Sequence, residues 1–228
     1  MIRYPGHAPI PILYEDNHLI AVDKPAGLLS QKDHSMDADI LTLTKAYLAE
    51  KYDKKGNVYL GLVHRLDRPV SGVMLMARTS KAASRLSEQI RSHQWKKMYL
   101  AICEGVIDQQ ANLKHYLLKH ASTNQSKVVS ASTKGAKQAE LGYKRLSTDG
   151  KRSLVKVELK TGRAHQIRVQ FAHIGHPLLN DAKYGGKAKQ LKGDIALRAH
   201  ALTVIHPTKK EPLCIEASIP SNSLWSTL

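Results

Sequence analysis

The feature that most constrains the fold of this chain is a long succession of short apolar runs, with helical spacing in only three places. Strand-like runs occupy residues 12–14, 19–22, 59–63, 73–77, 98–103, 141–146, 154–159, 202–205 and 213–217. Helical spacing occurs in residues 40–48 and 82–90 and in a segment that starts at His165 and stops at Gly175 and Pro177. Because strands and helices do not alternate regularly, a parallel sheet with crossover helices is disfavoured. The sequence predicts an α+β domain with a mostly antiparallel mixed β-sheet and flanking helices and loops.

The predicted domain organisation is a single domain over residues 1–228. Residues 1–11 contain three prolines and are expected to form an irregular lead-in. Asp39 is placed to cap the first helix, and Thr79 or Ser80 the second. Residues 119–137 are polar with little apolar periodicity, which predicts a long loop. A chain of this length removes roughly 70–75% of its unfolded surface from water on folding, so its core needs no disulfide or metal.

The charge balance points to a polyanionic partner. Lys and Arg number 35 against 19 Asp and Glu, which leaves a net charge of +16 before any of the 12 histidines is counted. The simpler alternative is a basic surface that only keeps the protein soluble. An excess this large in a chain of this size favours RNA or DNA.

Other classes of protein are disfavoured by what the sequence lacks. Cys103 and Cys214 are far apart and outside any metal-ligand spacing, so both are predicted to be reduced, buried residues of a cytoplasmic protein. No run approaches the ~20 apolar residues that span a membrane. There is no phosphate-cradling glycine loop, and His173 and His176 flank a helix end without a Cys or carboxylate partner. We therefore expect no membrane contact, no metal and no cofactor.

The first segment that could carry chemistry is residues 61–72, GLVHRLDRPVSG. Asp67 lies between Arg65 and Arg68, in a loop that is bounded by Pro and Gly and set between two apolar runs. Nearby positive charge keeps a carboxylate ionised, as a nucleophile or a base requires. The alternative is an ordinary surface salt bridge in a polar turn.

The second segment is residues 159–170, LKTGRAHQIRVQ. Thr161 and Gly162 predict a turn, after which a helix places His165 and Arg168 on one side, with Ala172. Its other side, formed by Ile167, Phe171 and Ile174, is expected to face the core. Arg, His and Gln grouped in this way suit contacts to phosphates and bases. The alternative is an amphipathic helix with an ordinary solvated face.

Together these segments resemble the RluA-like family of RNA pseudouridine synthases. His64–Asp67 with Arg68, Ser71 and Gly72 is similar to the catalytic-loop signature of that family, and Thr161–Arg163 with His165–Arg168 to its second signature. Further matches, in chain order, are residues 22–27, residues 97–101, residues 176–178 with Asp181, and residues 200–207. The resemblance extends from Ile12 to Ala217. Two departures are the lack of room for the S4-type domain that many members carry, and Leu141 where the family often has Thr.

The resemblance implies that the chain isomerises uridine to pseudouridine within a folded RNA, without metal or cofactor. Asp67 would be the nucleophile or base that starts cleavage of the glycosidic bond. Arg168 would pair with Asp67 and hold it charged. Tyr99 would pack on the flipped base and help remove the C5 proton. The domain over residues 1–228 would then be a pseudouridine synthase catalytic domain.

RNA contacts are also implied. Arg65 is expected to fill the space that a flipped base leaves, since extruding a base costs a few kcal/mol. Arg163, His165 and Gln166 are predicted RNA contacts, as is Lys24, for which a turn residue beside Pro25 is the alternative. The expected partner is a tRNA or rRNA stem-loop, with a slight preference for tRNA, bound by a monomer.

Three alternatives remain at this point. A non-catalytic RNA-binding or ribosome-associated protein explains the charge but not the carboxylate loop. A hydrolase of N-glycosidic bonds would be expected to use two carboxylates, and no partner for Asp67 is evident. A catalytically dead relative is disfavoured because Asp67, Tyr99 and Arg168 are all present. Isomerisation leaves the RNA mass unchanged, whereas hydrolysis releases uracil, so mass spectrometry separates these functions.

Overall fold

A computed structural model describes residues 1–120, 122–186, 194–220 and 225 of the chain. The chain divides into two compact units. Unit 1 comprises Met1–Trp95 and Ala199–Ser218, and unit 2 comprises Lys96–Arg198 and Ile219–Leu228. The predicted single catalytic domain over residues 1–228 stays a prediction.

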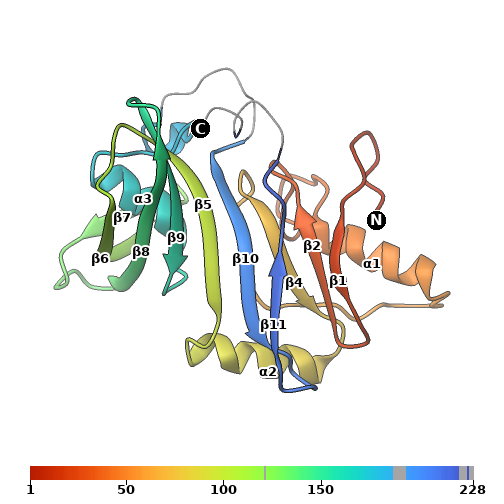
Figure 1. Cartoon of the computed structure of the whole chain (residues 1–228). Coiled ribbons are helices and arrows are strands. Elements are labelled where there is room, and N and C mark those ends of the chain that lie inside the picture. Colours follow the sequence, from red (N-terminus) through yellow and green to blue (C-terminus); the bar gives the residue numbers. More distant parts are fainter. Residues whose placement is uncertain (121, 187–193, 221–224, 226–228) are drawn as a thin grey trace. The chain divides into compact units, whose positions relative to one another are not determined.

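Unit 1 is a sheet with two helices (Figure 1). Its elements are β1 (Ile12–Glu15), β2 (Leu19–Lys24), α1 (Ile40–Lys51), β3 (Gly61–Leu62), β4 (Ser71–Ala77), α2 (Ser80–Arg91), β10 (Leu197–Ile205, in this unit from Ala199) and β11 (Pro212–Glu216). The strands of this unit follow the order β1-β2-β4-β10, with β3 paired to β4 and β11 paired to β10. Pairs β1–β2, β2–β4, β3–β4 and β10–β11 are antiparallel.

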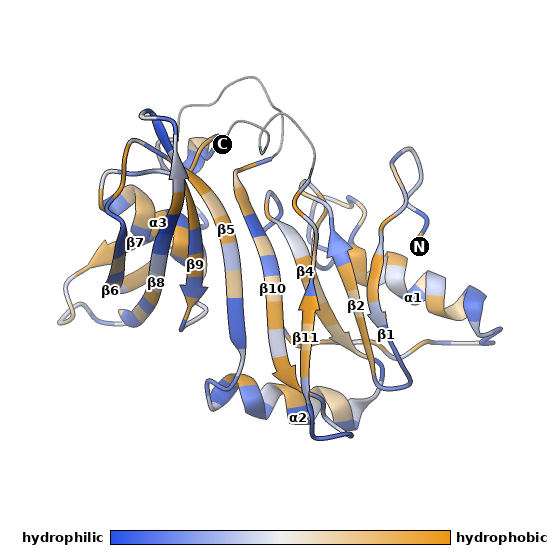
Figure 2. Cartoon of the chain, viewed as in Figure 1, coloured by the Kyte–Doolittle hydropathy of each residue, from blue (hydrophilic) through white to orange (hydrophobic). Residues whose placement is uncertain are grey.

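The core of unit 1 forms where the apolar strands meet α2. Thr79 caps that helix by accepting a hydrogen bond from the Ala82 backbone amide, as predicted. Leu86 and Ala82 are buried on its inner side. The buried cluster contains Leu19, Ala21, Val73, Leu75, Ala77, Ala82, Leu86, Trp95, Leu202, Val204, Ile215 and Ala217. In Figure 2, β2 is hydrophobic up to its hydrophilic end, and all of its residues except Asp23 are buried. Such a strand is buried on both faces, which fixes its place inside the sheet.

Helix α1 begins where it was predicted, but its buried face differs from the predicted one. Asp39 caps it as expected, by accepting from the Thr42 backbone amide. The fully buried residues are Ile40, Thr44 and Leu48, whereas Leu43 and Tyr47 are only half-buried. The Thr44 hydroxyl can be buried because it donates to the Ile40 carbonyl at 2.7 Å.

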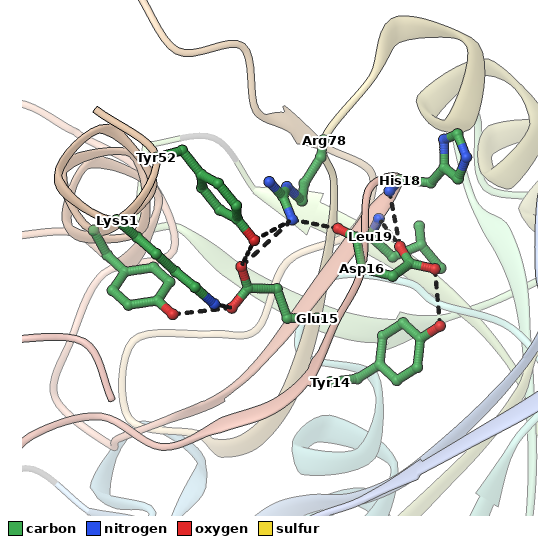
Figure 3. A network of polar contacts seen from close by, with 9 residues as sticks. Tyr14, Glu15, Asp16, His18, Leu19, Lys51, Tyr52 and Arg78 are labelled. Atoms are coloured by element: carbon green, nitrogen blue, oxygen red, sulfur yellow. Dashed lines mark hydrogen bonds and ion pairs between the residues drawn. The ribbon is translucent and has the colours of Figure 1, made fainter. Parts of the chain in front are cut away.

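A polar network joins the β1–β2 turn to α1 and β4 (Figure 3). Glu15 accepts hydrogen bonds from Tyr47, Lys51 and Tyr52. Figure 3 also shows Arg78 directed at Glu15 and at the Asp16 carbonyl. The carboxylate of Glu15 is therefore paired and hydrogen-bonded within unit 1, and the network stabilises the hairpin.

Asp16 links the same turn to the end of β10. Its carboxylate accepts from Tyr14, from the backbone amides of His18 and Leu19, and from Nε2 of His206 at 2.7 Å. Burial alone would raise the pKa of Asp16, but these hydrogen bonds outweigh it and lower the pKa to about 2. Nδ1 of His206 accepts from two backbone amides, so the ring proton is on Nε2.

Unit 2 is an antiparallel sheet with one helix on one face (Figure 1). Its elements are β5 (Lys96–Glu104), β6 (Gln110–His120), β7 (Gln125–Val129), β8 (Lys137–Thr148), β9 (Arg152–Leu159), α3 (Gln166–His173) and the short 3-10 helix η1 (Ala182–Tyr184). The order is β5-β9-β8-β6-β7, and each neighbouring pair is antiparallel. Val169 of α3 packs on Leu117 and Ala139.

The predicted loop over residues 119–137 is wrong. Except for residue 121, which lies outside the described residues, this segment contains the end of β6, the whole of β7 and the start of β8. Strand β6 was also missed, and the run at residues 59–63 yields only the two-residue β3. The alternation of β6 is weak because Tyr116, Leu117 and Leu118 follow one another and its inner face includes His115. The strand is instead defined by backbone pairing with β7 and β8, which the side-chain pattern does not reveal.

The predicted fold class is confirmed: the chain is α+β with a mostly antiparallel sheet. One detail about the cysteines is corrected, because Cys103 is buried but Cys214 is exposed on β11. Both thiols are free. No helix in the described part of the chain is long and apolar enough to cross a membrane.

Candidate active site

The carboxylate loop, residues 64–70, joins β3 to β4 in unit 1, and Asp67 within it is half-buried. The preceding residue, Leu66, is fixed by Ser30 through both its backbone carbonyl and its backbone amide. The Ser30 hydroxyl donates to the Leu66 carbonyl at 2.7 Å and accepts from the Leu66 amide at 3.2 Å. The Val70 amide closes the turn on the Asp67 carbonyl at 3.0 Å. Asp67 is therefore held on a backbone that has few other conformations open to it.

The residue after Asp67 is fixed by the turn that follows β2. The Arg68 carbonyl accepts from the Gly27 amide at 2.8 Å and from Nζ of Lys24 at 3.2 Å. Lys24 also donates to the carbonyls of Pro25 and Leu28 and has no exposed surface. The prediction of Lys24 as a phosphate contact is therefore corrected. It is an internal brace of the carboxylate loop, because a buried ammonium must satisfy its donors within the protein.

The two arginines of the loop differ. Arg68 donates through Nε to the Gly27 carbonyl and pairs with Asp37 at 2.8 Å, so it does not bracket Asp67 as the sequence suggested. Arg65 is exposed and makes no hydrogen bond or ion pair with any residue that the structure describes. Its side chain is available to a partner in solution.

Two further contacts seat this loop on β4. Nε2 of His64 accepts from the Leu75 amide at 2.9 Å, which continues the strand pairing where β3 stops. Gly72 has a φ of +118°, and a Cβ there would lie 2.2 Å from the Ala199 carbonyl oxygen. Only glycine allows this close approach of two backbones.

In unit 2, Arg168 is clamped by two residues that follow α3. Its Nε and Nη2 donate to the two carboxylate oxygens of Asp181 at 2.7 and 2.8 Å. The ring of Tyr184 lies 5.2 Å from the guanidinium carbon. Arg168 and Asp181 are both almost fully buried. A planar, bidentate, buried pair fixes the orientation of the guanidinium as well as its position.

Helix α3 begins at a strained residue. His165 adopts a left-handed conformation, with φ of 54°, and gives no side-chain cap. Gln166 instead fixes the turn before the helix: its amide oxygen accepts from the Arg163 amide and the Thr161 hydroxyl, and its nitrogen donates to the Glu140 carbonyl. Gln166 is 3% exposed, so its prediction as an RNA contact is corrected.

The β6–β7 hairpin holds the same end of α3. The Ser126 hydroxyl donates to the Ala164 carbonyl at 2.7 Å, and the Ser126 amide donates to the Tyr184 hydroxyl at 2.8 Å. That hydroxyl lies 2.7 Å from Nδ1 of His165. Strands that looked like a loop in sequence are thus part of the support for Arg168.

Strand β5 carries Tyr99, which lies opposite Val157 of β9 and is half-buried. The same strand anchors the segment that leads to Asp181. The Leu179 amide donates to the Ile102 carbonyl at 2.8 Å, and the Glu104 amide donates to the Pro177 carbonyl at 2.9 Å. One strand therefore positions both Tyr99 and the partner of Arg168.

The predicted site residues fall into two groups. Lys24, Arg65 and Asp67 lie in unit 1, with Lys24 and the carboxylate loop in direct contact. Tyr99, Arg163, His165, Gln166 and Arg168 lie in unit 2. The pairing of Arg168 with Asp67 stays a prediction.

Sequence reasoning missed the supporting residues Ser30, Ser126 and Tyr184, and it gave no role to Asp181. A signal existed only for Asp181, which the family resemblance matched together with residues 176–178. Over the described ranges, no group of three or more His, Cys, Asp and Glu residues could hold a metal ion.

Comparison with known proteins gives a consistent result. The family described as "RNA pseudouridylate synthase" matches residues 18–173. "Ribosomal large subunit pseudouridine synthase D" of Xylella fastidiosa is 32% identical over 231 residues, which cover 96% of this chain and 68% of that protein. "Uncharacterized RNA pseudouridine synthase YhcT" of Bacillus subtilis is 33% identical over 222 residues, covering 96% and 71%.

Solved structures share the fold. The structure titled "Human RNA Pseudouridylate Synthase Domain Containing 4" aligns with a TM-score of 0.77 at 23% identity, over 92% of this chain and 88% of that one. The structure titled "Human RNA Pseudouridylate Synthase Domain Containing 1" aligns with a TM-score of 0.78 at 20% identity, over 98% and 91%.

Proposed function

We propose, from the premise that this chain belongs to the RNA pseudouridylate synthase family and is an RNA isomerase, that it converts one specific uridine of a structured RNA to pseudouridine. The base is detached from ribose at N1, turned, and rejoined through C5. Atoms balance without a co-reactant, because the product is an isomer of the substrate. The observation that carries the proposal is the Asp67 carboxylate on a loop braced by Ser30, Gly27 and Lys24.

Asp67 acts in this proposal as the nucleophile that starts glycosidic cleavage. A nucleophile must meet its target atom in a narrow range of geometries, and a small misplacement slows the reaction steeply. The hydrogen bonds on both neighbours of Asp67 meet this demand before RNA binds. Arg168, held in orientation by Asp181, supplies the cation that keeps the carboxylate charged.

Tyr99 is the surface on which the uracil packs, and it assists removal of the C5 proton. Arg65 enters the stack that the uridine leaves. Its exposure and its lack of a partner among the described residues suit this role, since a guanidinium plane can stack on bases.

The substrate that we propose is ribosomal RNA, with tRNA as the second candidate. The relative from Xylella fastidiosa is named for the large ribosomal subunit. The net charge of +16 suits either RNA. We further propose that the enzyme is a cytoplasmic monomer, consistent with its two free cysteines.

The test is Asp67→Asn, which keeps the size of the side chain but removes its charge. Pseudouridine is mapped in total RNA from cells with and without the gene, and the identified RNA is then used with purified protein. We expect Asp67→Asn to abolish conversion while RNA affinity stays within about twofold of wild type, a difference of well under 1 kcal/mol.

The matched control is Asp53→Asn, a change of an exposed carboxylate, which should leave conversion unchanged. Appreciable turnover by the Asp67 variant would refute the nucleophile assignment. Release of free uracil by the wild type, seen by mass spectrometry, would replace isomerase with hydrolase.

A further inference from the structure

Lys97 is a half-buried lysine on the inner face of the unit 2 sheet, two residues before Tyr99. It lies opposite Leu159 of β9, which in turn lies opposite Leu141 of β8. Residues directly opposite each other share a face of the sheet, so the stem of Lys97 rests against apolar neighbours. Because side chains alternate along a strand, Lys97 and Tyr99 also share this face.

The ammonium of Lys97 lies at the turn that leads into α3. A Cβ built on Gly162 would be only 3.4 Å from Nζ, so the ammonium lies directly over this glycine. The exposed Arg163 is the next residue, and its Nε is fixed by the Gln138 carbonyl at 2.9 Å. Burial, and then the positive charge of Arg163, lower the pKa of Lys97. Two cations are therefore held close together.

No carboxylate balances this pair within the described residues. The nearest acidic positions on the paired strands are Glu140 and Glu158. By alternation from Leu141 and Leu159 they lie on the opposite face of the sheet. Glu158 is moreover engaged by Lys160 on that face. A desolvated lysine beside an arginine, without a counterion, is unfavourable in the free protein and favourable when an anion arrives.

We propose that Lys97 and Arg163 together bind one phosphodiester of the RNA, at the nucleotide whose base packs on Tyr99 or at its immediate neighbour. This assignment rests on the proposed function, which places the uracil on Tyr99. Residues two apart on a strand are separated by about 7 Å, a span that a nucleotide bridges from base to phosphate. The amino end of α3 adds a positive dipole at the same turn.

The first test measures RNA affinity against salt, with a fluorescent 12-nucleotide oligouridylate as the probe. Lys97→Met keeps the length of the stem and removes the charge. Loss of one contact to a single strand should lower the slope of log affinity against log salt by about 0.7. Affinity at low salt should fall roughly tenfold or more, as for loss of a charge-assisted hydrogen bond.

The matched controls separate a phosphate contact from general charge and from structure. Lys156→Met removes the same charge from the exposed outer face of β9 and should leave the slope unchanged. Lys97→Arg keeps a cation and should retain most of the affinity. The thermal midpoint of Lys97→Met should equal or exceed that of wild type, because a desolvated cation near Arg163 is removed. A structural role would instead lower it.

The second test locates the phosphate on an RNA that the wild type converts. Neutral methylphosphonates replace single phosphates around the target uridine, and kcat/KM is measured for wild type and Lys97→Met. At one position, the methylphosphonate should lower kcat/KM of the wild type about as much as Lys97→Met lowers it on unmodified RNA. The same methylphosphonate should cause no further loss of kcat/KM in Lys97→Met.

Equal salt slopes for Lys97→Met and wild type, or the same loss in Lys156→Met, would overturn the proposal. So would additive losses at every methylphosphonate position. If the wild type converts no RNA, the proposed isomerase function fails, and the salt slopes still decide the phosphate contact.

Discussion

At the scale of single residues, the arrangement around Arg168 shows how a charge is kept in one orientation. Burying an arginine costs several kcal/mol unless its hydrogen bonds are satisfied. Asp181 satisfies Nε and Nη2, and the Tyr184 ring covers the guanidinium. The pair therefore fixes the orientation of the guanidinium, and for the proposed function we expect this geometry to matter more than any net gain in stability.

Asp181→Asn should lower kcat at least tenfold with little change in KM. The reason is that a neutral amide pairs more weakly with the guanidinium of Arg168 and no longer fixes its orientation. It should also destabilise unit 2 by about 3–5 kcal/mol, as removal of one partner of a buried pair does. Steady-state kinetics and urea unfolding measure the two effects. Tyr184→Phe, which keeps the ring, should cost less than Asp181→Asn in both. A reversed order would contradict the clamp.

Arg65→Ala should harm a structured substrate more than one whose target uridine is already unstacked. If Arg65 replaces the extruded base, its loss removes an offset to an unstacking cost of a few kcal/mol. A relaxed substrate never incurs that cost. The measurement is the ratio of variant to wild-type kcat/KM on a stem-loop and on its relaxed counterpart. Equal ratios would leave Arg65 as a general electrostatic residue.

Residue types and spacing in the sequence could predict the carboxylate loop, but not which cations face solvent. The residue types of Lys24 and Gln166 suit contacts to phosphates and bases, but both side chains are buried. Their partners are distant in sequence: Lys24 donates to the Arg68 carbonyl, 44 residues away, and Gln166 to the Glu140 carbonyl, 26 residues away. Burial of this kind is decided by tertiary structure and leaves no local pattern.

At the scale of elements, predictability followed the strength of the local signal. Helix α2 and strand β4 were predicted closely, since a cap, an amphipathic face and a continuous apolar run are local features. The β6–β7 hairpin was missed because polar and apolar residues do not alternate regularly along it, and its stability comes from pairing with β8 and packing on α3. The same hairpin supplies Ser126, whose hydrogen bonds to Ala164 and Tyr184 support the end of α3 that carries Arg168.

The link between the β1–β2 turn and β10 should show in the acid stability of the protein. The pKa of Asp16 is lowered to about 2, so its carboxylate stabilises the fold above its unfolded pKa of about 4. That contribution is lost as pH falls from about 4 towards 2. Because the side chain is partly exposed, we expect roughly 1–2 kcal/mol.

Asp16→Asn tests this contribution when the stabilities of variant and wild type are compared at pH 6 and near pH 2. Wild type should exceed the variant in unfolding free energy at pH 6, and the gap should close near pH 2. Urea titrations across the range measure it, with the exposed Asp53→Asn as a control that should show no such gap. A gap that persists at pH 2 would mean that size or hydrogen bonding, and not charge, matters at Asp16.

At the scale of the whole molecule, the net charge of +16 should make RNA binding strongly dependent on salt. Each phosphate neutralised contributes a slope of about 0.7 to 0.9 to log affinity against log salt. Several contacts should therefore give a slope of several units, measured by anisotropy from about 50 to 200 mM salt. A slope near zero would assign the excess charge to solubility alone. This expectation rests on composition alone, whereas the division into two compact units had no sign in the sequence.

Strand β5 carries Tyr99 and also fixes, through Ile102 and Glu104, the segment that holds Asp181. Thermal displacements of the aromatic ring and of the guanidinium beyond it must then be correlated, because both depend on one backbone. Their separation should fluctuate less than either position does. Any displacement of this strand should therefore carry the two groups together and leave their spacing nearly unchanged.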